Sequence, residues 1–262
     1  MVLSKLIPGY KHIYRIGSPY PNDTYKLYKY MNVQRAINFL QTREFCFVEP
    51  TMWHDPYESR FYKADYKNVN YKPIQLFCTC LTNRMSNEAA WRMYRGNNGG
   101  IEDRTIRFDF KRSSLLKALD KTGIKFYLGY ANYAYTKKQI DEIHKNTNPE
   151  YEKLFSNFSE DKFVNLLLIK RKAFEYESEV RLFMKPEYRK PNNGDYIEIN
   201  NNIKAVRFCL EDLIDMVNQI SVDPSCSELE YKMIASYVKQ ISSEYLCRHN
   251  GLYRKSTKII IE

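Results

Sequence analysis

A row of acidic side chains stands out in an otherwise basic chain, between residues 174 and 183. This stretch reads FEYESEVRLF, in which apolar or small residues alternate with charged ones. Because successive side chains of a strand point to opposite faces, the alternation predicts one strand with four charged side chains on a single face. They are Glu175, Glu177, Glu179 and Arg181. Neighbouring carboxylates repel one another unless a cation lies opposite, so the row is either a solvated sheet face or part of a site.

A lysine between two tyrosines marks a second predicted strand. The segment KLYKYM at 26–31 contains Tyr28, Lys29 and Tyr30, and alternation places the lysine on the opposite face from both tyrosines. A lysine that reaches solvent along its alkyl stem would explain the pattern without any site. Tyrosines, in turn, are either half-buried core or a platform on which rings and bases stack.

A third predicted strand, IQLFCTCLT at 74–82, is almost continuously apolar, as a central buried strand should be. Its middle, Cys-Thr-Cys, is small and weakly polar, which tight core packing alone could explain. Because Lys29, Thr79 and Glu179 lie on three candidate central strands, we expect these three side chains to converge on one cleft.

The elements around these strands predict one mixed α+β domain over 1–262. Strand and helix patterns follow one another without a regular β-α-β rhythm, and no internal repeat or linker is visible. Residues 136–172 predict a helical insertion, and residues 225–247 predict a long C-terminal helix. A tight hairpin is predicted between strands at 195–200 and 203–210.

The charge balance favours a polyanionic partner. Lysine and arginine number 41 against 31 acidic residues, which gives a net charge of +10. Such a balance favours nucleic acid or an acidic protein as partner. The alternative is an AT-rich gene, in which Lys, Asn and Tyr accumulate without function, because the basic residues form no long run.

Cysteine usage and hydropathy favour a cytoplasmic protein without a metal. The six cysteines and four histidines are scattered without paired ligand motifs. The first 17 residues lack an apolar core of signal-peptide length, and no later stretch is long enough for a membrane span. No GxGxxG motif follows a strand, so no Rossmann cofactor site is predicted.

A metal nuclease is a weaker alternative, built on Asp55, Glu58 and Asp103. The segment containing the first two is a predicted loop, because Asp55-Pro56 is typical of a turn. A turn capped by Asp55, with Glu58 held by a neighbouring basic residue, explains these residues better.

Four segments, in their order and spacing, resemble a bacterial family described only as domain-of-unknown-function family 2971. They are YKYMNVQRAINFL, MWHDPYES, WRMYRG and FEYESEVRLF. The resemblance covers about residues 25–185 and continues weakly into VDPSCSELEYKMIASYV. The chain departs from the family pattern at His54 (usually Asn), at Ala90 before Trp91 (commonly Met) and at Phe174 (usually Trp), and no ionisable group is lost.

That family is similar in layout to ADP-ribosyltransferases, which implies a largely antiparallel split sheet flanked by helices. One class of these enzymes carries Arg on a first strand, Ser-Thr-Ser on a second and Glu-x-Glu at the start of a later one. Here Lys29 stands for the Arg, Cys-Thr-Cys around Thr79 for Ser-Thr-Ser, and Glu177-Ser178-Glu179 for Glu-x-Glu. A lysine cannot form the bidentate fork that an arginine offers to a phosphate.

The resemblance implies a reaction in which NAD loses nicotinamide through an oxocarbenium-like transition state. A carboxylate near the anomeric carbon stabilises such developing charge. By the resemblance, Glu179 would stabilise the cation, and Glu177 would orient or deprotonate the acceptor.

The resemblance also implies a set of residues around NAD. Lys29 would meet the diphosphate or a ribose, and Thr79 would support the glutamates from the neighbouring strand. Tyr28, Tyr30 and Tyr94 would stack on nicotinamide. Arg181 would offset the charge of the acidic row and fix its geometry within the cofactor site.

These observations favour an NAD-dependent ADP-ribosyltransferase that modifies nucleic acid or protein, as a toxin or anti-phage effector with an antitoxin as a possible partner. The basic balance and the tyrosines favour nucleic acid as acceptor. Two alternatives stay open: an enzyme that cleaves NAD without an acceptor, and a non-catalytic nucleic-acid-binding protein in which the glutamates are structural.

Overall fold

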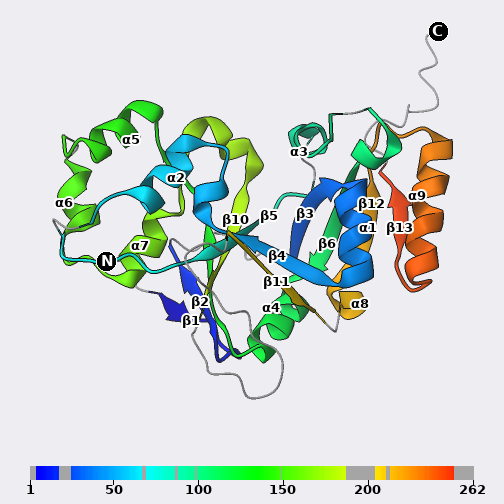
Figure 1. Ribbon diagram of the computed structural model, residues 1–262, viewed down its shortest axis with the longest axis horizontal. Coiled ribbons are helices and arrows are strands. Elements are labelled where there is room, and N and C mark those ends of the chain that lie inside the picture. Colours follow the sequence, from blue (N-terminus) through cyan, green and yellow to red (C-terminus); the bar gives the residue numbers. More distant parts are fainter. Residues whose placement is uncertain are drawn as a thin grey trace, which may run out of the picture.

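One large mixed sheet runs through the whole molecule (Figure 1). The computed structural model describes residues 4–17, 25–66, 69–85, 88–97, 99–147, 149–186, 204–210 and 213–250. Within these residues the sheet order is β1-β2-β7-β10-β5-β3-β6-β12-β13, with β4 paired to β5 and β11 paired to β4. All pairs described in this sheet are antiparallel except β2–β7 and β12–β13. The predicted α+β class with a largely antiparallel sheet is confirmed.

The strands of this sheet are β1 (Lys5–Leu6), β2 (Ile13–Ile16), β3 (Lys26–Asn32), β4 (Glu44–Val48), β5 (Phe77–Thr82), β6 (Thr105–Lys111), β7 (Lys125–Tyr130), β10 (Glu179–Lys185), β11 (Ala205–Cys209), β12 (Val217–Val222) and β13 (Cys247–His249). A separate parallel pair consists of β8 (Asn132–Tyr135) and β9 (Ile169–Arg171). The predicted strand at 195–200, and with it the predicted hairpin, lies outside the described residues.

The helices are α1 (Val33–Thr42), α2 (Pro56–Lys63), α3 (Glu88–Met93), α4 (Arg112–Lys121), α5 (Lys137–His144), α6 (Glu150–Phe155), α7 (Glu160–Leu166), α8 (Leu213–Met216) and α9 (Glu228–Ile241). Short 3-10 turns are η1 (Pro50–Met52), η3 (Ile101–Asp103) and η4 (Lys172–Glu177). The segment 136–172 thus contains α5, α6, α7 and then β9. Among the described helices, none is long and apolar enough to cross a membrane.

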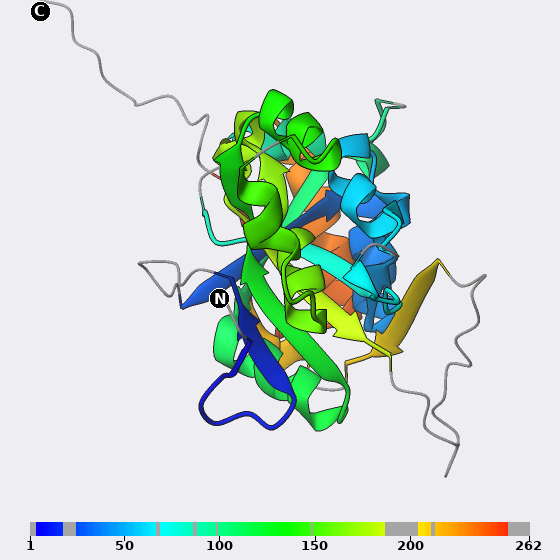
Figure 2. The same ribbon diagram turned by 90° about the vertical axis from the view of Figure 1, so that its left-hand side faces the viewer.

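The helices gather in two groups at opposite ends of the sheet. In Figure 1, α2, α5, α6 and α7 lie at one end, and α1, α8 and α9 lie at the other. Figure 2 faces the first end and shows its helices in front of the strands. The two ends meet at β5, whose one edge contacts β4 at Val48↔Cys78 and β3 at Tyr28↔Thr82. The sheet therefore splits along this edge of β5.

Capping side chains fix where several helices begin. Asn32 accepts a hydrogen bond from the Arg35 backbone N–H at the start of α1. Thr136 with Gln139, and Ser227 with Glu230, form reciprocal capping boxes at the starts of α5 and α9. Each of these contacts satisfies a backbone donor that the first helical turn leaves without a partner.

The sheet buries apolar side chains on both faces. The first core gathers Phe39, Phe45, Phe47, Phe108, Phe110 and Leu182. The second core gathers Phe61, Tyr66, Tyr127, Phe163 and Phe183. Alternation along β10 sends Leu182 into one core and Phe183 into the other, as the pleat requires.

His144 gives the second core a dependence on pH. Its ring stacks on Phe61 with the centroids 4.5 Å apart, and burial, with a smaller effect of Arg60, lowers the pKa of His144 from 6.5 to about 4. Between pH 6.5 and 4 the unfolded chain therefore binds a proton that the folded chain rejects. The free energy of unfolding should fall as pH falls through this window.

We expect His144→Leu to lose less stability than the wild type between pH 7 and pH 5, as measured by urea unfolding. The matched control is His54→Leu at an exposed position, which should keep the wild-type difference. Equal losses in His144→Leu and the wild type would contradict the role of His144.

Candidate active site

The acidic row is divided between a turn and a strand. β10 begins only at Glu179, whereas Glu175 and Glu177 belong to η4, and Ser178 adopts a left-handed backbone with φ 45°. The last pair between β10 and β5 is Glu179↔Thr82, where β5 ends. The prediction of one continuous strand is therefore wrong, because the backbone before Glu179 has no strand to pair with and glutamate has low strand propensity.

The turn nevertheless brings Glu177 back beside Glu179, where both carboxylates contact one lysine. The Nζ of Lys170, on β9, forms ion pairs with both glutamates. It also lies 3.3 Å from Oε1 of Glu58, on α2. Burial opposes the charge of this ammonium, but the carboxylates outweigh burial and raise the pKa of Lys170 above its ordinary value. A buried ammonium thus holds three carboxylates together.

Arg181 contacts two of these three carboxylates, those of Glu58 and Glu179. Its Nε donates to Oε1 of Glu179 at 2.7 Å, and its other nitrogens donate to Glu58 and to the Leu167 carbonyl. The guanidinium lies over the Trp53 ring, 4.4 Å from the centroid. Because the side chain is fully buried, Arg181 acts on the site through Glu58 and Glu179 and not by direct contact with a ligand. Its observed contacts neutralise and orient the glutamates.

The two glutamates of the site differ in their readiness to take a proton. Burial alone would raise the pKa of Glu179, but the charges of Arg181 and Lys170 outweigh burial and hold it far below its ordinary value. For Glu177 burial dominates over the attraction of Lys170, and its pKa is raised. Two neighbouring carboxylates with pKa values pushed apart are suited to two different roles. The surroundings therefore favour the ionised form of Glu179 and make Glu177 the more readily protonated of the two carboxyls.

Glu179 lies between two pockets. The first, which we call the tyrosine pocket, is narrow and has a cavity volume of about 20 Å³. The second, the arginine pocket, has a cavity volume of about 380 Å³. Residues of the tyrosine pocket include Tyr28, Tyr30, Cys80, Tyr94, Glu177 and Glu179. Residues of the arginine pocket include Arg84, Tyr130, Tyr133, Glu175, Tyr176 and Glu179. The volume of the arginine pocket lies in the range that small-molecule sites occupy, and that of the tyrosine pocket lies below it.

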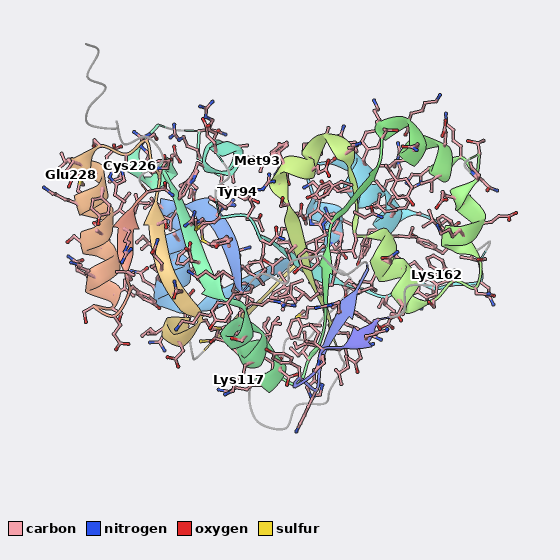
Figure 3. All side chains as sticks on the ribbon, turned by 180° about the vertical axis from the view of Figure 1, so that it is seen from behind. Met93, Tyr94, Lys117, Lys162, Cys226 and Glu228 are labelled. Atoms are coloured by element: carbon pink, nitrogen blue, oxygen red, sulfur yellow. The ribbon has the colours of Figure 1, made fainter. Side chains whose placement is uncertain are left out.

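Aromatic rings line one wall of the tyrosine pocket. Tyr30 stacks with Tyr94, with centroids 6.1 Å apart and planes 16° apart, and meets the edge of Trp91 at 5.0 Å. Figure 3 shows Tyr94 beside Met93 at the end of α3, on the side that faces η4 and β10. Tyr94 is 40% exposed, so its ring is available to a ligand. The structure therefore places Tyr28, Tyr30 and Tyr94 together with both predicted catalytic glutamates.

A buried arginine that sequence reasoning missed supports this wall. The guanidinium of Arg107, on β6, lies 5.0 Å from the Tyr28 ring centroid and 5.7 Å from that of Trp91. Its charge is balanced by Asp109, whose Oδ1 accepts from Arg107 Nε at 2.7 Å. The alternation in TIRFDF at 105–110 does contain this signal, since it puts Arg107 and Asp109 on one strand face.

Lys29 and Thr79 do not join the site. Lys29 Nζ donates to Thr79 Oγ1 at 2.7 Å, but Lys29 shares its strand face with Leu27 and Met31, which belong to the first core. Thr79 is paired with Leu182 of the same core. The prediction that these two residues converge with Glu179 on one cleft is therefore wrong.

The alternation of side chains between the two faces of each strand explains this error. Since Tyr28 points into the pocket, its neighbour Lys29 must point to the other face. Thr82 takes the position that was predicted for Thr79, because it is paired with Glu179 and lines the tyrosine pocket. Its hydroxyl donates to the carbonyls of Glu177 and Ser178, at 2.8 and 3.1 Å, and so fixes the turn.

The residues of the nuclease alternative have other roles. Asp55 caps α2 by accepting from the Tyr57 backbone N–H at 2.9 Å, and Glu58 is held by Lys170 and Arg181. Asp103 accepts from the Gly99 N–H at 2.8 Å. Across the described ranges, no group of three or more His, Cys, Asp or Glu residues is arranged to hold a metal ion.

Comparison with known proteins gives one family match and a distant structural likeness. The sequence model of the family described as "Protein of unknown function (DUF2971)" matches residues 90–182, in agreement with the predicted resemblance. No curated protein matches the chain in sequence.

Solved structures with a distant likeness to this chain include those of Thermus sp. 2.9 DarT. The complex with NAD+ has a TM-score of 0.36 and 8% identity, over 87% of this chain and 96% of that chain. The complex with ADP-ribosylated ssDNA has a TM-score of 0.37 and 9% identity, over 87% of this chain and 94% of that chain.

Proposed function

We propose that this protein is an ADP-ribosyltransferase that breaks the ribose–nicotinamide bond of NAD beside Glu179 and transfers ADP-ribose to a nucleic acid. One observation carries the proposal. Glu179, kept ionised by Arg181 and Lys170, lies where the tyrosine pocket and the arginine pocket meet. A fixed carboxylate that borders two pockets can meet a donor on one side and an acceptor on the other.

The charge of the cluster suits a transition state with developing positive charge. Departure of nicotinamide leaves an oxocarbenium-like ribose, which a preorganised carboxylate in a water-poor site stabilises. When all groups are ionised, three carboxylates (Glu58, Glu177 and Glu179) face two cations (Lys170 and Arg181), so one negative charge remains in excess. The two cations also fix the Glu179 carboxylate before the substrate arrives.

The two pockets divide the substrates between them. The exposed ring of Tyr94, which is backed by Tyr30, offers a stacking surface for the nicotinamide ring at the tyrosine pocket. The acceptor enters the arginine pocket, where Arg84 can meet a phosphate and tyrosines can meet a base. The net charge of +10 supports a polyanionic acceptor. A toxin or anti-phage role with an antitoxin partner, and a cytoplasmic location, stay predictions.

Glu177 acts on the acceptor in this proposal. Its raised pKa makes it the carboxylate that exchanges a proton. We expect Glu177→Gln to lower ADP-ribose transfer to an oligonucleotide by roughly a hundredfold, while slow hydrolysis of NAD persists, since general-base catalysis contributes on this scale. Both products are measured in the same reaction, with labelled NAD and either single-stranded DNA or RNA.

The pH profile gives a second readout for the same variant. Wild-type transfer should fall as pH drops through the raised pKa of Glu177, because a protonated base cannot accept the acceptor's proton. Glu177→Gln should lack this acid limb. The control is the exposed Glu152→Gln on α6, which should behave as wild type. If Glu177→Gln lowered transfer and hydrolysis equally, the proposal that Glu177 acts on the acceptor would be contradicted.

A further inference from the structure

The phenol of Tyr133 connects the backbone of Glu179 to the arginine pocket. Tyr133 lies on β8, and its hydroxyl oxygen accepts a hydrogen bond from the Glu179 backbone N–H at 2.9 Å. The same tyrosine is a lining residue of the arginine pocket. Its hydroxyl therefore lies next to the residue that we propose as catalytic, on the side where the acceptor enters.

The way β7 ends explains why a side chain contacts this N–H. The ladder between β10 and β7 ends at Val180↔Tyr130, and the Ala131 N–H then donates to the Glu179 carbonyl at 3.0 Å. In a regular antiparallel ladder, Glu179 would return a second hydrogen bond to the Ala131 carbonyl. Here the Glu179 N–H donates to the Tyr133 hydroxyl instead. The phenol thus replaces a backbone partner at the first residue of β10.

The hydroxyl of Tyr133 keeps a proton that it can donate. A phenol oxygen that accepts one hydrogen bond can still donate its own O–H. Within the part of the chain that the structure describes, no group accepts this proton. Burial and the negative charge of Glu179 raise the pKa of Tyr133, so the hydroxyl stays protonated at neutral pH. Because a half-buried tyrosine normally finds a partner for its hydroxyl, this O–H can serve a molecule in the pocket.

The charges that line the arginine pocket decide which kind of atom this proton can meet. Glu175 and Glu179 bring negative charge to the pocket, and Arg84 brings positive charge. A phosphate is attracted to the guanidinium and repelled by a carboxylate. Tyr133 contacts Glu179, so its O–H suits an uncharged oxygen or nitrogen with a lone pair. Arg84 suits the phosphate of the same ligand.

We propose that Tyr133 positions the acceptor by donating a hydrogen bond to an uncharged oxygen or nitrogen of its nucleoside, while Arg84 meets a phosphate. This role of Tyr133 rests on the proposed function, in which a nucleic acid enters the arginine pocket. The hydrogen bond holds the nucleoside at the start of β10, beside Glu179. Because Tyr133 contacts the acceptor and not NAD, its loss affects transfer and not hydrolysis.

Tyr133→Phe removes the donor and keeps the ring. We expect the KM for a single-stranded oligonucleotide to rise roughly threefold to tenfold, the scale of one neutral hydrogen bond. Hydrolysis of NAD without an acceptor should stay within about twofold of the wild-type rate, since water can accept the bond from the Glu179 N–H. The control is Tyr135→Phe, also half-buried on β8 but not a lining residue of either pocket, which should leave both quantities unchanged.

A second variant separates donation from acceptance by the same oxygen. In 3-fluorotyrosine the fluorine withdraws electrons, so the hydroxyl becomes a stronger donor and a weaker acceptor. With this amino acid in place of Tyr133, we expect a KM for the oligonucleotide equal to or below that of the wild type. If Tyr133 only fixed the Glu179 N–H, both variants would instead weaken the reaction, and transfer and hydrolysis would fall together.

Binding of a labelled single-stranded oligonucleotide without NAD, followed by fluorescence anisotropy, keeps this test separate from the proposed function. A wild type that binds the oligonucleotide but releases no nicotinamide contradicts the proposed function, and Tyr133 is then judged by affinity alone, which Tyr133→Phe should lower. Equal affinity and equal KM in Tyr133→Phe and the wild type would overturn the role of Tyr133. So would a parallel fall of transfer and hydrolysis, a 3-fluorotyrosine variant as weak as Tyr133→Phe, or a wild type that binds no oligonucleotide.

Discussion

Replacing Glu179 with glutamine is expected to slow nicotinamide release from NAD by about a hundredfold or more, with NAD affinity nearly unchanged. Glutamine keeps the size and most hydrogen bonds of the side chain but removes the charge that stabilises the oxocarbenium-like transition state. Removing one preorganised electrostatic group has effects on this scale. An interaction that matters only in the transition state appears in turnover and not in binding. Steady-state release and calorimetric titration with NAD measure the two quantities.

A matched variant separates chemistry from folding. Glu49 is also a buried carboxylate with a lysine partner, since Lys204 forms an ion pair with it. Glu49 is not a lining residue of the tyrosine pocket or of the arginine pocket. We expect Glu49→Gln to cost stability but to keep turnover. If Glu179→Gln is folded and releases nicotinamide at the wild-type rate, Glu179 is not the catalytic carboxylate.

The largest loss of stability is expected for Arg181→Met. This change keeps most of the side chain's volume but leaves Glu58 and Glu179 buried with only Lys170 to balance them. Removing one partner of a buried ion pair costs roughly 3–5 kcal/mol in the free energy of unfolding. Urea unfolding at pH 7 measures it. Lys153→Met, which removes an exposed pair with Glu150, should cost less than about 1 kcal/mol.

The pH dependence of this deficit identifies its cause. Without the guanidinium, the pKa values of the buried Glu58 and Glu179 carboxyls rise. The folded variant then binds more protons than its unfolded chain. The deficit of Arg181→Met should therefore shrink as pH falls from 7 to 5. A deficit that is constant over this range would indicate lost packing, and a deficit below about 1 kcal/mol at pH 7 would contradict the buried-charge account.

Local patterns located strands such as β3 and β5 correctly. The errors in the predicted site arose from the pairing between strands, which local patterns do not contain. The segments at 26–31 and 74–82 are strands β3 and β5, and alternation correctly put Lys29 on the opposite face from Tyr28 and Tyr30. Alternation cannot tell which face of one strand matches which face of the next, because that depends on register. For this reason the sequence pattern predicts Thr79 beside Glu179, whereas the strand pairing puts Thr82 there.

The cluster around Glu179 could be predicted only in part. Glu177 and Glu179 are close in sequence, so their proximity survives the change from a strand to a turn. Lys170 and Glu58 arrive from β9 and α2 through long-range packing, which no local pattern reveals. The signal for Lys170 in the sequence is that this lysine directly follows the apolar run LLLI at 166–169.

Release of nicotinamide from NAD by the wild-type protein tests the central claim most directly. The purified protein is incubated with NAD alone, and with single-stranded DNA, RNA or a protein mixture added, and free nicotinamide is quantified. The account predicts release that is accelerated by a nucleic acid, with ADP-ribose recovered on that nucleic acid, and no release by Glu179→Gln beyond about one hundredth of the wild-type rate. Absence of nicotinamide under every condition, from a folded protein, would contradict the account.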